Sequence, residues 1–267
     1  MPLNLGADAV KYPQWLNLKN YATMFVRSVV KMNFKVIKPE GIELLAINRF
    51  NDSKSFYESN KAQIKELVTD QLRALLNDLF DTLVEINPNF ILSPARCISR
   101  VRRDTRFSND KTLYRENLWM MFRHQKNHLP TPAMWFEFFP DGYAYGCGVI
   151  CSTPAFMEHW RKSLKANPAK IENIAESLCS SELKLDDERY KRSKAIADGI
   201  SGNAAIWYDQ KHIFVSHYCN SIKPLNQPKK LVKELTDAYT AAKPLYDYLL
   251  SLTKAFNGNL EGFDERG

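Results

Sequence analysis

The most densely charged stretch of the sequence runs from Ala95 to Lys126 and contains nine basic and three acidic residues. This excess of six positive charges is most of the net charge of +7 of the whole chain. Seven of the nine basic residues are arginines, the residue type suited to planar, bidentate binding of a carboxylate or a phosphate. The stretch is therefore where we expect an anion to bind.

Within this stretch, residues Ser99 to Phe107 read SRVRRDTRF. If they form a strand, alternation places four side chains on one face, namely Arg100, Arg102, Asp104 and Arg106. The opposite face then carries Val101, Arg103, Thr105 and Phe107. One carboxylate among three arginines leaves a surplus of positive charge, which an anion lying between them would relieve.

The next residues, Ser108 to Asp110, form a polar turn that we expect to cap a short helix beginning near Lys111. A helix N-terminus offers free N–H groups and a partial positive charge to an anion. In this interpretation the anion is clamped by Arg100, Arg102, Arg106 and Lys111. Asp104 or Asp110 orients these side chains or acts as a base, and Tyr114 donates a hydrogen bond. The predicted ligand-binding set is Arg100, Arg102, Asp104, Arg106, Ser108, Asp110, Lys111 and Tyr114.

Other functions fit the same residues. Arg102 and Arg106 could instead form a structural network with Asp104, Asp110 and Glu137, as in a protein-interaction or scaffold protein, or the stretch could be a solvated face. A nucleic-acid-binding module is a further alternative, because basic residues alternate with aromatic ones that could stack on bases, namely Tyr114, Trp119, Phe122 and Trp135. A net charge of +7 is low for that role.

Sequence motifs for familiar chemistry are missing. There is no P-loop, GxGxxG, GxSxG or HExxH motif, so the sequence leaves open whether the protein is an enzyme. The five cysteines are irregularly spaced without a CxxC pair, which predicts reduced thiols and no zinc site. His124 and His128 fall in an expected hairpin loop. We expect no metal and no cofactor.

Two kinds of element are expected to hold this stretch in place. Apolar residues recur at helical spacing from Asp52 or Ser53 to Val84, and Asn87-Pro88-Asn89 ends that helix. Further helical patterns cover 156–164, 171–178 and 231–256, the last with a kink or break expected at Pro244.

The centre of the chain is typical of β-structure. Short aromatic runs cover 118–123 and 134–139, and the turn Pro140-Asp141-Gly142 leads into a returning strand at 143–150. Gly146 and Gly148 in that strand indicate a bulge or a close approach by another group. A last strand is expected at 212–218. Together these elements predict an α+β fold, with a central, mostly antiparallel sheet packed against long amphipathic helices around a single core.

The stretch Arg100 to Arg115 resembles the signature of an uncharacterised bacterial and fungal family, domain of unknown function 2461, apart from Leu113, where the family usually has Pro, and Arg115, where it usually has Lys. Similar segments occur at 51–57, 137–142, 189–192 and 243–249. The resemblance covers roughly 37–256, and it implies one α+β domain there, after an N-terminal elaboration at 1–36 and before a tail at 257–267. The family carries no established activity, so the resemblance implies a fold and a site without a reaction.

The sequence shows no signal peptide, and the apolar segment from Tyr21 to Val30 is too short to span a bilayer. We therefore expect a soluble, cytoplasmic protein that does not bind membranes. The expected partner is a small anionic ligand, with nucleic acid as the less favoured alternative, and the oligomeric state stays open.

Overall fold

Five antiparallel strands in the order β1-β2-β3-β5-β4 form the centre of the computed structural model, which describes residues 34–124, 130–189 and 200–258. The strands are β1 (Leu118–Arg123), β2 (Thr131–Phe139), β3 (Gly142–Ile150), β4 (Lys184–Leu185) and β5 (Phe214–Cys219). The hairpin expected around Pro140-Asp141-Gly142 is present, with Phe139 opposite Gly142. The predicted α+β class is confirmed.

Helices precede, interrupt and follow these strands. The first group is α2 (Pro39–Asn51), α3 (Lys54–Ile64), the π-helix η1 (Lys65–Thr69), α4 (Asp70–Ile86) and α5 (Pro94–Cys97). The second group is α6 (Pro154–Ala166), α7 (Ala169–Leu178), α8 (Gly202–Tyr208), the 3-10 helix η2 (Lys223–Asn226) and α9 (Pro228–Gly258).

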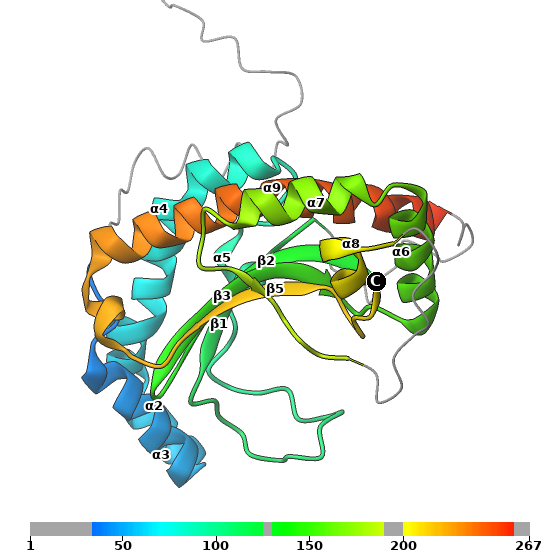
Figure 1. Ribbon diagram of the computed structural model, residues 1–267. Coiled ribbons are helices and arrows are strands. Elements are labelled where there is room, and N and C mark those ends of the chain that lie inside the picture. The colour runs from blue at the N-terminus through cyan, green and yellow to red at the C-terminus, as the bar shows by residue number, and fades with distance from the viewer. Residues whose placement is uncertain (1–33, 125–129, 190–199, 259–267) are drawn as a thin grey trace, which may run out of the picture.

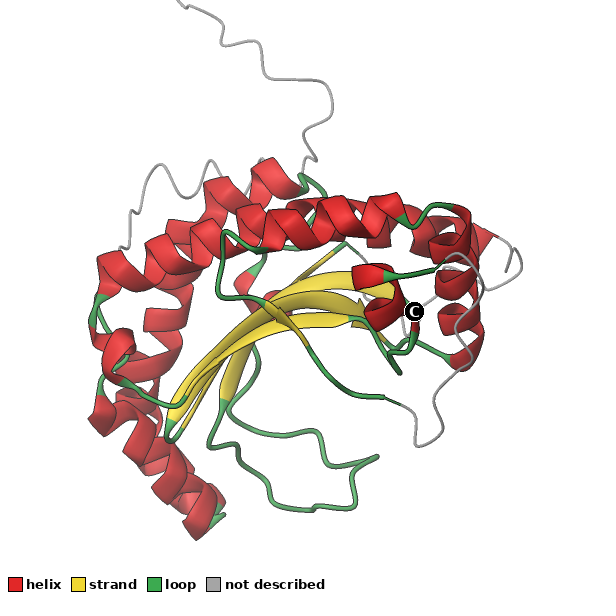
Figure 2. Cartoon of the chain, viewed as in Figure 1, coloured by secondary structure: helices red, strands yellow, loops and turns green. Residues whose placement is uncertain are grey.

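The long helices α4, α7 and α9 lie along one face of the curved sheet (Figure 1, Figure 2). Strand β1 buries every second side chain, Leu118, Met120 and Phe122, and β2 places Phe138, Phe136 and Met134 directly opposite them. This alternation gives the sheet one apolar face, which packs against the helices and forms a continuous core with them. In the described part of the chain, the other face carries loops, among them the segment 100–117 (Figure 2).

The predicted helix from Ser53 onward is confirmed, because Ser53 accepts a hydrogen bond from the Phe56 amide at 3.1 Å and the helical run ends before Asn87. The π-turn η1 within it was not predicted, and neither was α2. Of the kink or break predicted at Pro244, the break is wrong, since α9 continues through this residue. Buried residues on both sides of Pro244, including Tyr239 and Leu245, offset the backbone hydrogen bond that proline removes.

The closely packed centre of the sheet explains two glycines of β3. A Cβ on Gly148 would lie 2.4 Å from the Ile213 oxygen, and one on Gly146 would lie 2.3 Å from the Val215 oxygen. The backbone at Ile213 and Val215 therefore approaches β3 closely, as the two glycines predicted. Residues 1–33 of the N-terminal elaboration, His128, residues 190–192 and most of the expected tail lie outside the described residues.

Candidate functional site

The charged segment 100–117, called the arginine loop below, connects α5 to β1 and projects from the sheet (Figure 1). Its two arms run antiparallel, with Arg102 opposite Tyr114. The Arg103 amide donates to the Leu113 oxygen at 2.8 Å, and the Arg115 amide donates to the Val101 oxygen at 2.9 Å. The Ser99 amide also donates to the Trp119 oxygen at 2.9 Å, so the predicted strand at 99–107 is reduced to its first half, residues 99–103.

Exposure alternates along the first arm of the arginine loop. Arg100, Arg102, Asp104 and Arg106 are exposed, as the alternation predicted, whereas Val101 is buried. Phe107, expected on the same face as Val101, is exposed as well, because the chain turns at this point. Arg106 donates three hydrogen bonds to the Asp104 carboxylate, from Nε to Oδ1 at 2.9 Å and to Oδ2 at 3.3 Å and from a terminal nitrogen to Oδ2 at 2.7 Å. This pairing lowers the pKa of Asp104 to about 2. Asp104 and Arg106 therefore neutralise each other at the surface, away from both pockets described below.

The helix expected to begin near Lys111 is absent from the described loop, and this prediction is wrong. Oδ1 of Asp110 accepts hydrogen bonds from the Thr112 amide at 2.9 Å and from the Thr112 hydroxyl at 2.8 Å. The Asp110 carboxylate thus closes a local turn, an alternative to a helix that aspartate commonly offers the backbone. Lys111 donates from Nζ to the Thr105 oxygen at 3.0 Å, across the same turn.

Arg103, which the sequence analysis left out of the predicted site, lies at the centre of the arginine loop. Its guanidinium group contacts Asp110 and Thr112 directly and donates to the Ser108 hydroxyl at 3.2 Å. The hydrogen bonds from Thr112, followed by the contact with Arg103, lower the pKa of Asp110, so its carboxylate stays ionised and is a poor proton acceptor near neutral pH. Ser108 and Asp110 are brought together by Arg103, and Arg100 and Arg102 are not part of this cluster.

A second arginine reaches the loop from the end of α2. Arg49 donates to the Thr112 hydroxyl at 3.2 Å and to the Tyr114 oxygen at 3.3 Å, and it lies 3.4 Å from Asp110 and 3.6 Å from Glu116. Asp52, at the C-terminal end of α2, accepts a hydrogen bond from the Leu113 amide at 2.6 Å. The sequence held no signal for this contact, because the residues are about sixty positions apart and α2 was not predicted.

Arg49, Arg103 and a third arginine, Arg115, line a pocket of about 340 Å³ that we call the arginine pocket. Its remaining lining residues are Asp110, Glu116, Asn117, Phe139 and Pro140. The pocket therefore contains three guanidinium groups and two carboxylates. Its volume lies at the lower end of the range for small-molecule sites, about 300–1,000 Å³.

Arg115 differs from the other two arginines in its partners. Its guanidinium carbon lies 4.3 Å from the ring centroid of Trp119, and its Nε is buried without a hydrogen-bond partner. Among the described residues, no carboxylate lies within 4.0 Å of it. Burial lowers the pKa of Arg115. The positive charges of Arg103 and Arg49 lower this pKa further, whereas the negative charge of Glu137 raises it. The Glu137 carboxylate itself accepts a hydrogen bond from Asn117.

Tyr114, predicted to contact a ligand, is buried and stacks on Tyr57 of α3 with ring centroids 4.9 Å apart. Burial raises the pKa of its hydroxyl. Tyr114 therefore anchors the arginine loop to α3 rather than lining the arginine pocket. Tyr57 itself lines a second pocket, together with residues 94–102.

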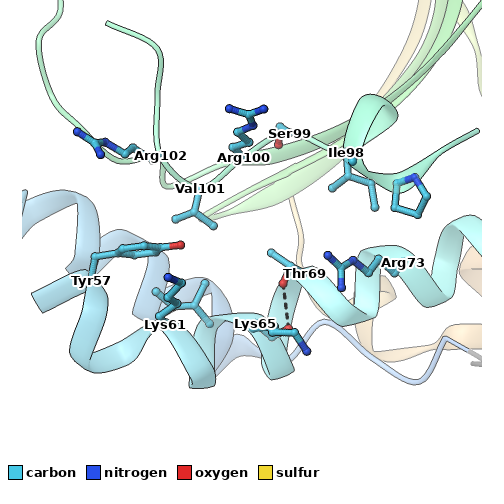
Figure 3. Close-up of a pocket in the computed structure, with 13 residues that line it drawn as sticks. Tyr57, Lys61, Lys65, Thr69, Arg73, Ile98, Ser99, Arg100, Val101 and Arg102 are labelled. Carbon is cyan, nitrogen blue, oxygen red and sulfur yellow. Dashed lines mark hydrogen bonds between the residues drawn. The ribbon is translucent and has the colours of Figure 1, made fainter. Parts of the chain in front are cut away.

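This second pocket, the basic pocket, has a volume of about 450 Å³ and lies between α3, η1 and α4 on one side and residues 94–102 on the other (Figure 3). Arg100 and Arg102 belong to its lining through the first arm. Figure 3 shows Val101 pointing toward the helices, and the side chains of Arg100 and Arg102 pointing away from them. The predicted arginines thus border this pocket while their guanidinium groups face solvent.

The described residues give little support for a metal site. These residues contain no group of three or more His, Cys, Asp or Glu side chains arranged to hold a metal ion. All five cysteines are free thiols. In the described ranges, every helix is too short or too polar to cross a bilayer.

Comparison with known proteins agrees with the signature in the arginine loop. No curated protein and no solved structure matches the chain. One family model matches residues 40–248, more than three quarters of the chain, and it is described as conserved hypothetical protein (DUF2461). The match includes the arginine loop and both pockets, and the chain therefore belongs to the DUF2461 family.

Proposed function

We propose that this protein binds a small anionic ligand, bearing a phosphate or a carboxylate, in the arginine pocket, with Arg115 as the side chain that contacts it. The observation that carries the proposal is the state of Arg115: partly buried, stacked on Trp119, and without an anionic partner within 4.0 Å among the residues that the structure describes. A desolvated cation without a counter-charge is costly, and an anion in the pocket would offset that cost.

The other two arginines of the pocket support this role in a different way. Asp110 holds Arg103 and Arg49 in fixed positions, so that their charges face the pocket without being free to move away. Their positive field already acts on Arg115, since it lowers the pKa of that group. An anion beside Arg115 would therefore interact with three guanidinium groups and form charge-assisted hydrogen bonds with the free one.

A purely structural network accounts for Arg49 and Arg103 but leaves Arg115 unexplained. The nucleic-acid alternative is weakened by the positions of the aromatic side chains. Tyr114 and Phe122 are buried in the core, and one face of Trp119 is occupied by Arg115, so these rings offer few free surfaces on which bases could stack. We propose ligand binding without assigning a catalytic base, because Asp110 is engaged by two arginines and a threonine.

Isothermal titration calorimetry with inorganic phosphate, succinate and a nucleoside monophosphate tests the proposal. We expect at least one of these anions to bind, and Arg115→Gln to weaken its binding by about tenfold or more, the loss expected for one charge-assisted contact. Arg106→Gln is the matched control, because it removes the same charge from the same loop outside the pocket.

Equal affinities of the wild type and Arg115→Gln, or the absence of binding by all three anions, would overturn the proposal. Binding of single-stranded nucleic acid that weakens steeply with added salt, while the small anions fail to bind, would favour the nucleic-acid alternative instead.

A further inference from the structure

The basic pocket has a composition that the arginine pocket does not share. Five of its thirteen lining residues are cationic and none is acidic, and the cations are Lys61, Lys65, Arg73, Arg100 and Arg102. Its other lining residues include the apolar side chains Ile64, Ile98 and Val101 and the ring of Tyr57. This site is therefore both strongly cationic and partly apolar.

The cations of one wall form a row along consecutive turns. Lys61, Lys65, Thr69 and Arg73 follow one another at intervals of four residues, and all four line the pocket. In a continuous α-helix, steps of four residues drift by about 40° each around the axis, so that Lys61 and Arg73 would diverge by about 120°. The wider π-turn η1, at Lys65–Thr69, reduces this drift and keeps the row facing the pocket.

The backbone of the π-turn is stabilised locally. The Thr69 hydroxyl donates a hydrogen bond to the Lys65 oxygen at 3.1 Å, which Figure 3 marks within the pocket wall. π-turns inside α-helices are rare and occur frequently at functional sites, because they reposition side chains at a cost in helix stability. Here the repositioned side chains are those of the cationic row.

The row is only weakly neutralised. Lys61 lies 3.3 Å from Glu58, while Lys65 and Arg73 share one carboxylate, Asp70, at 2.6 and 3.2 Å. The cationic side chains of these pairs are at least half exposed, and such pairs contribute little free energy, so a ligand can replace them as partner. Arg100 and Arg102 add positive potential from the facing segment, where the described residues offer them no ion pair.

The floor of the pocket is apolar. Ile64 and Val101 are buried, and Figure 3 shows Val101 directed toward the helices that carry the cationic row. Ile98 and Tyr57 are half-buried beside them. A fully hydrated anion, such as free phosphate, would leave this apolar surface uncovered, whereas a ligand with an apolar body would cover it.

We infer that the basic pocket is a second binding site, distinct from the arginine pocket, for an amphipathic anion: a phosphate or carboxylate head joined to an apolar chain. The head contacts the cationic row, and the apolar body lies on Ile98 and the ring of Tyr57, which cover the buried Ile64 and Val101. This inference does not depend on the function proposed for the arginine pocket.

Decyl phosphate, used below its micelle concentration, is a suitable probe for calorimetric titration of the full chain. In Arg115→Gln, which lacks the contact proposed for anions in the arginine pocket, we expect it to bind at least about tenfold more tightly than inorganic phosphate and than decanol, since each lacks one of the two contacts. Failure of decyl phosphate to bind, or an affinity equal to that of either partial analogue, would overturn the inference.

Three variants locate the binding site. Lys61→Gln/Lys65→Gln removes part of the cationic row and should weaken decyl phosphate binding by about tenfold or more. Lys229→Gln/Lys230→Gln makes the same change in net charge at exposed positions at the start of α9, and should leave binding unchanged. Ala95→Trp places a large ring at an exposed lining position and should block the pocket, with an unchanged circular dichroism spectrum showing that the fold is intact.

Arg115→Gln separates the two sites, because it should leave decyl phosphate binding intact. Loss of decyl phosphate binding in Arg115→Gln, or its retention in both Lys61→Gln/Lys65→Gln and Ala95→Trp, would overturn the assignment to the basic pocket.

The natural ligand can be a free metabolite or a lipid headgroup in a bilayer. Sedimentation with vesicles of phosphatidylserine and phosphatidylcholine distinguishes them: sedimentation that is lost in Lys61→Gln/Lys65→Gln indicates a lipid, and its absence together with decyl phosphate binding indicates a free ligand.

Discussion

Arg103 and Asp110 face each other across the turn of the arginine loop, and their side chains are in direct contact. Arg103 is the less exposed of the two, with 14% of its side chain accessible against 45% for Asp110. It also binds Thr112 and Ser108, so one guanidinium group connects three positions of the second arm and turn. The conformation of the loop, and hence the shape of the arginine pocket, depends on this arginine.

Replacing Arg103 with alanine should loosen the arginine loop without unfolding the protein. We expect the free energy of opening the loop to fall by about 1.5–3 kcal/mol, the value of hydrogen bonds to a charged group. Native-state hydrogen exchange at the amides of residues 103 and 115, which bridge the two arms, measures it. Arg106→Ala serves as the control and should leave the exchange unchanged, because the Arg106–Asp104 pair is exposed.

The charge of Asp110 should make the loop sensitive to acid. Since its pKa is lower in the folded protein than in the unfolded chain, its stabilising contribution is fully present above the unfolded value of about 4. The contribution is lost as the pH falls from there through the lower folded pKa. Urea unfolding of the wild type and of Asp110→Asn should therefore show a difference that is constant between about pH 7 and 5 and shrinks below about pH 4. A difference that grows on acidification would contradict this.

A methyl group at Gly148 should destabilise the sheet. The added Cβ would lie 2.4 Å from the Ile213 oxygen, which accepts a hydrogen bond from the Val149 amide at 3.0 Å, so β3 and the adjoining chain would have to separate. We expect Gly148→Ala to lower the free energy of unfolding by at least about 1–3 kcal/mol, as overpacking does elsewhere. An unchanged urea midpoint would contradict this prediction, because the backbone at Ile213 would then move aside at no cost in free energy.

Four of the five cysteines should divide into two groups by reactivity, with the half-buried Cys219 between them. Cys151 and Cys179 are exposed, whereas Cys97 and Cys147 are buried, and burial raises the pKa of the Cys97 thiol to about 12. Because the thiolate is the reactive form, Ellman's reagent at pH 8 should modify the exposed pair rapidly and the buried pair only in denaturant. Cys151→Ser/Cys179→Ser should abolish the fast phase; rapid modification of Cys97 in the folded protein would contradict the structure.

The elements that the sequence predicted well are those with strong local signals. Ser53 caps a helix, Pro140-Asp141-Gly142 makes a hairpin, and the aromatic runs of β1 and β2 are strands, because capping, turn geometry and alternation act over a few residues. The break at Pro244 and the helix at Lys111 were predicted from equally local rules and were wrong. The packing of α9 along the sheet keeps the helix continuous through Pro244. The Asp110 side chain closes a turn where the helix near Lys111 was expected.

The sequence by itself determined the α+β class, the family and the place where positive charge concentrates. It also determined the alternation of Arg100, Arg102, Asp104 and Arg106, because successive side chains of an extended chain point to opposite sides. Only the tertiary structure decided which arginines meet. Arg49 reaches the loop from α2, Arg103 turns inward to Asp110, and Arg115 remains without a carboxylate partner in the described chain. Such contacts join residues far apart in the chain, and they depend on how α2, the arginine loop and β1 pack together, which no local pattern of residues records.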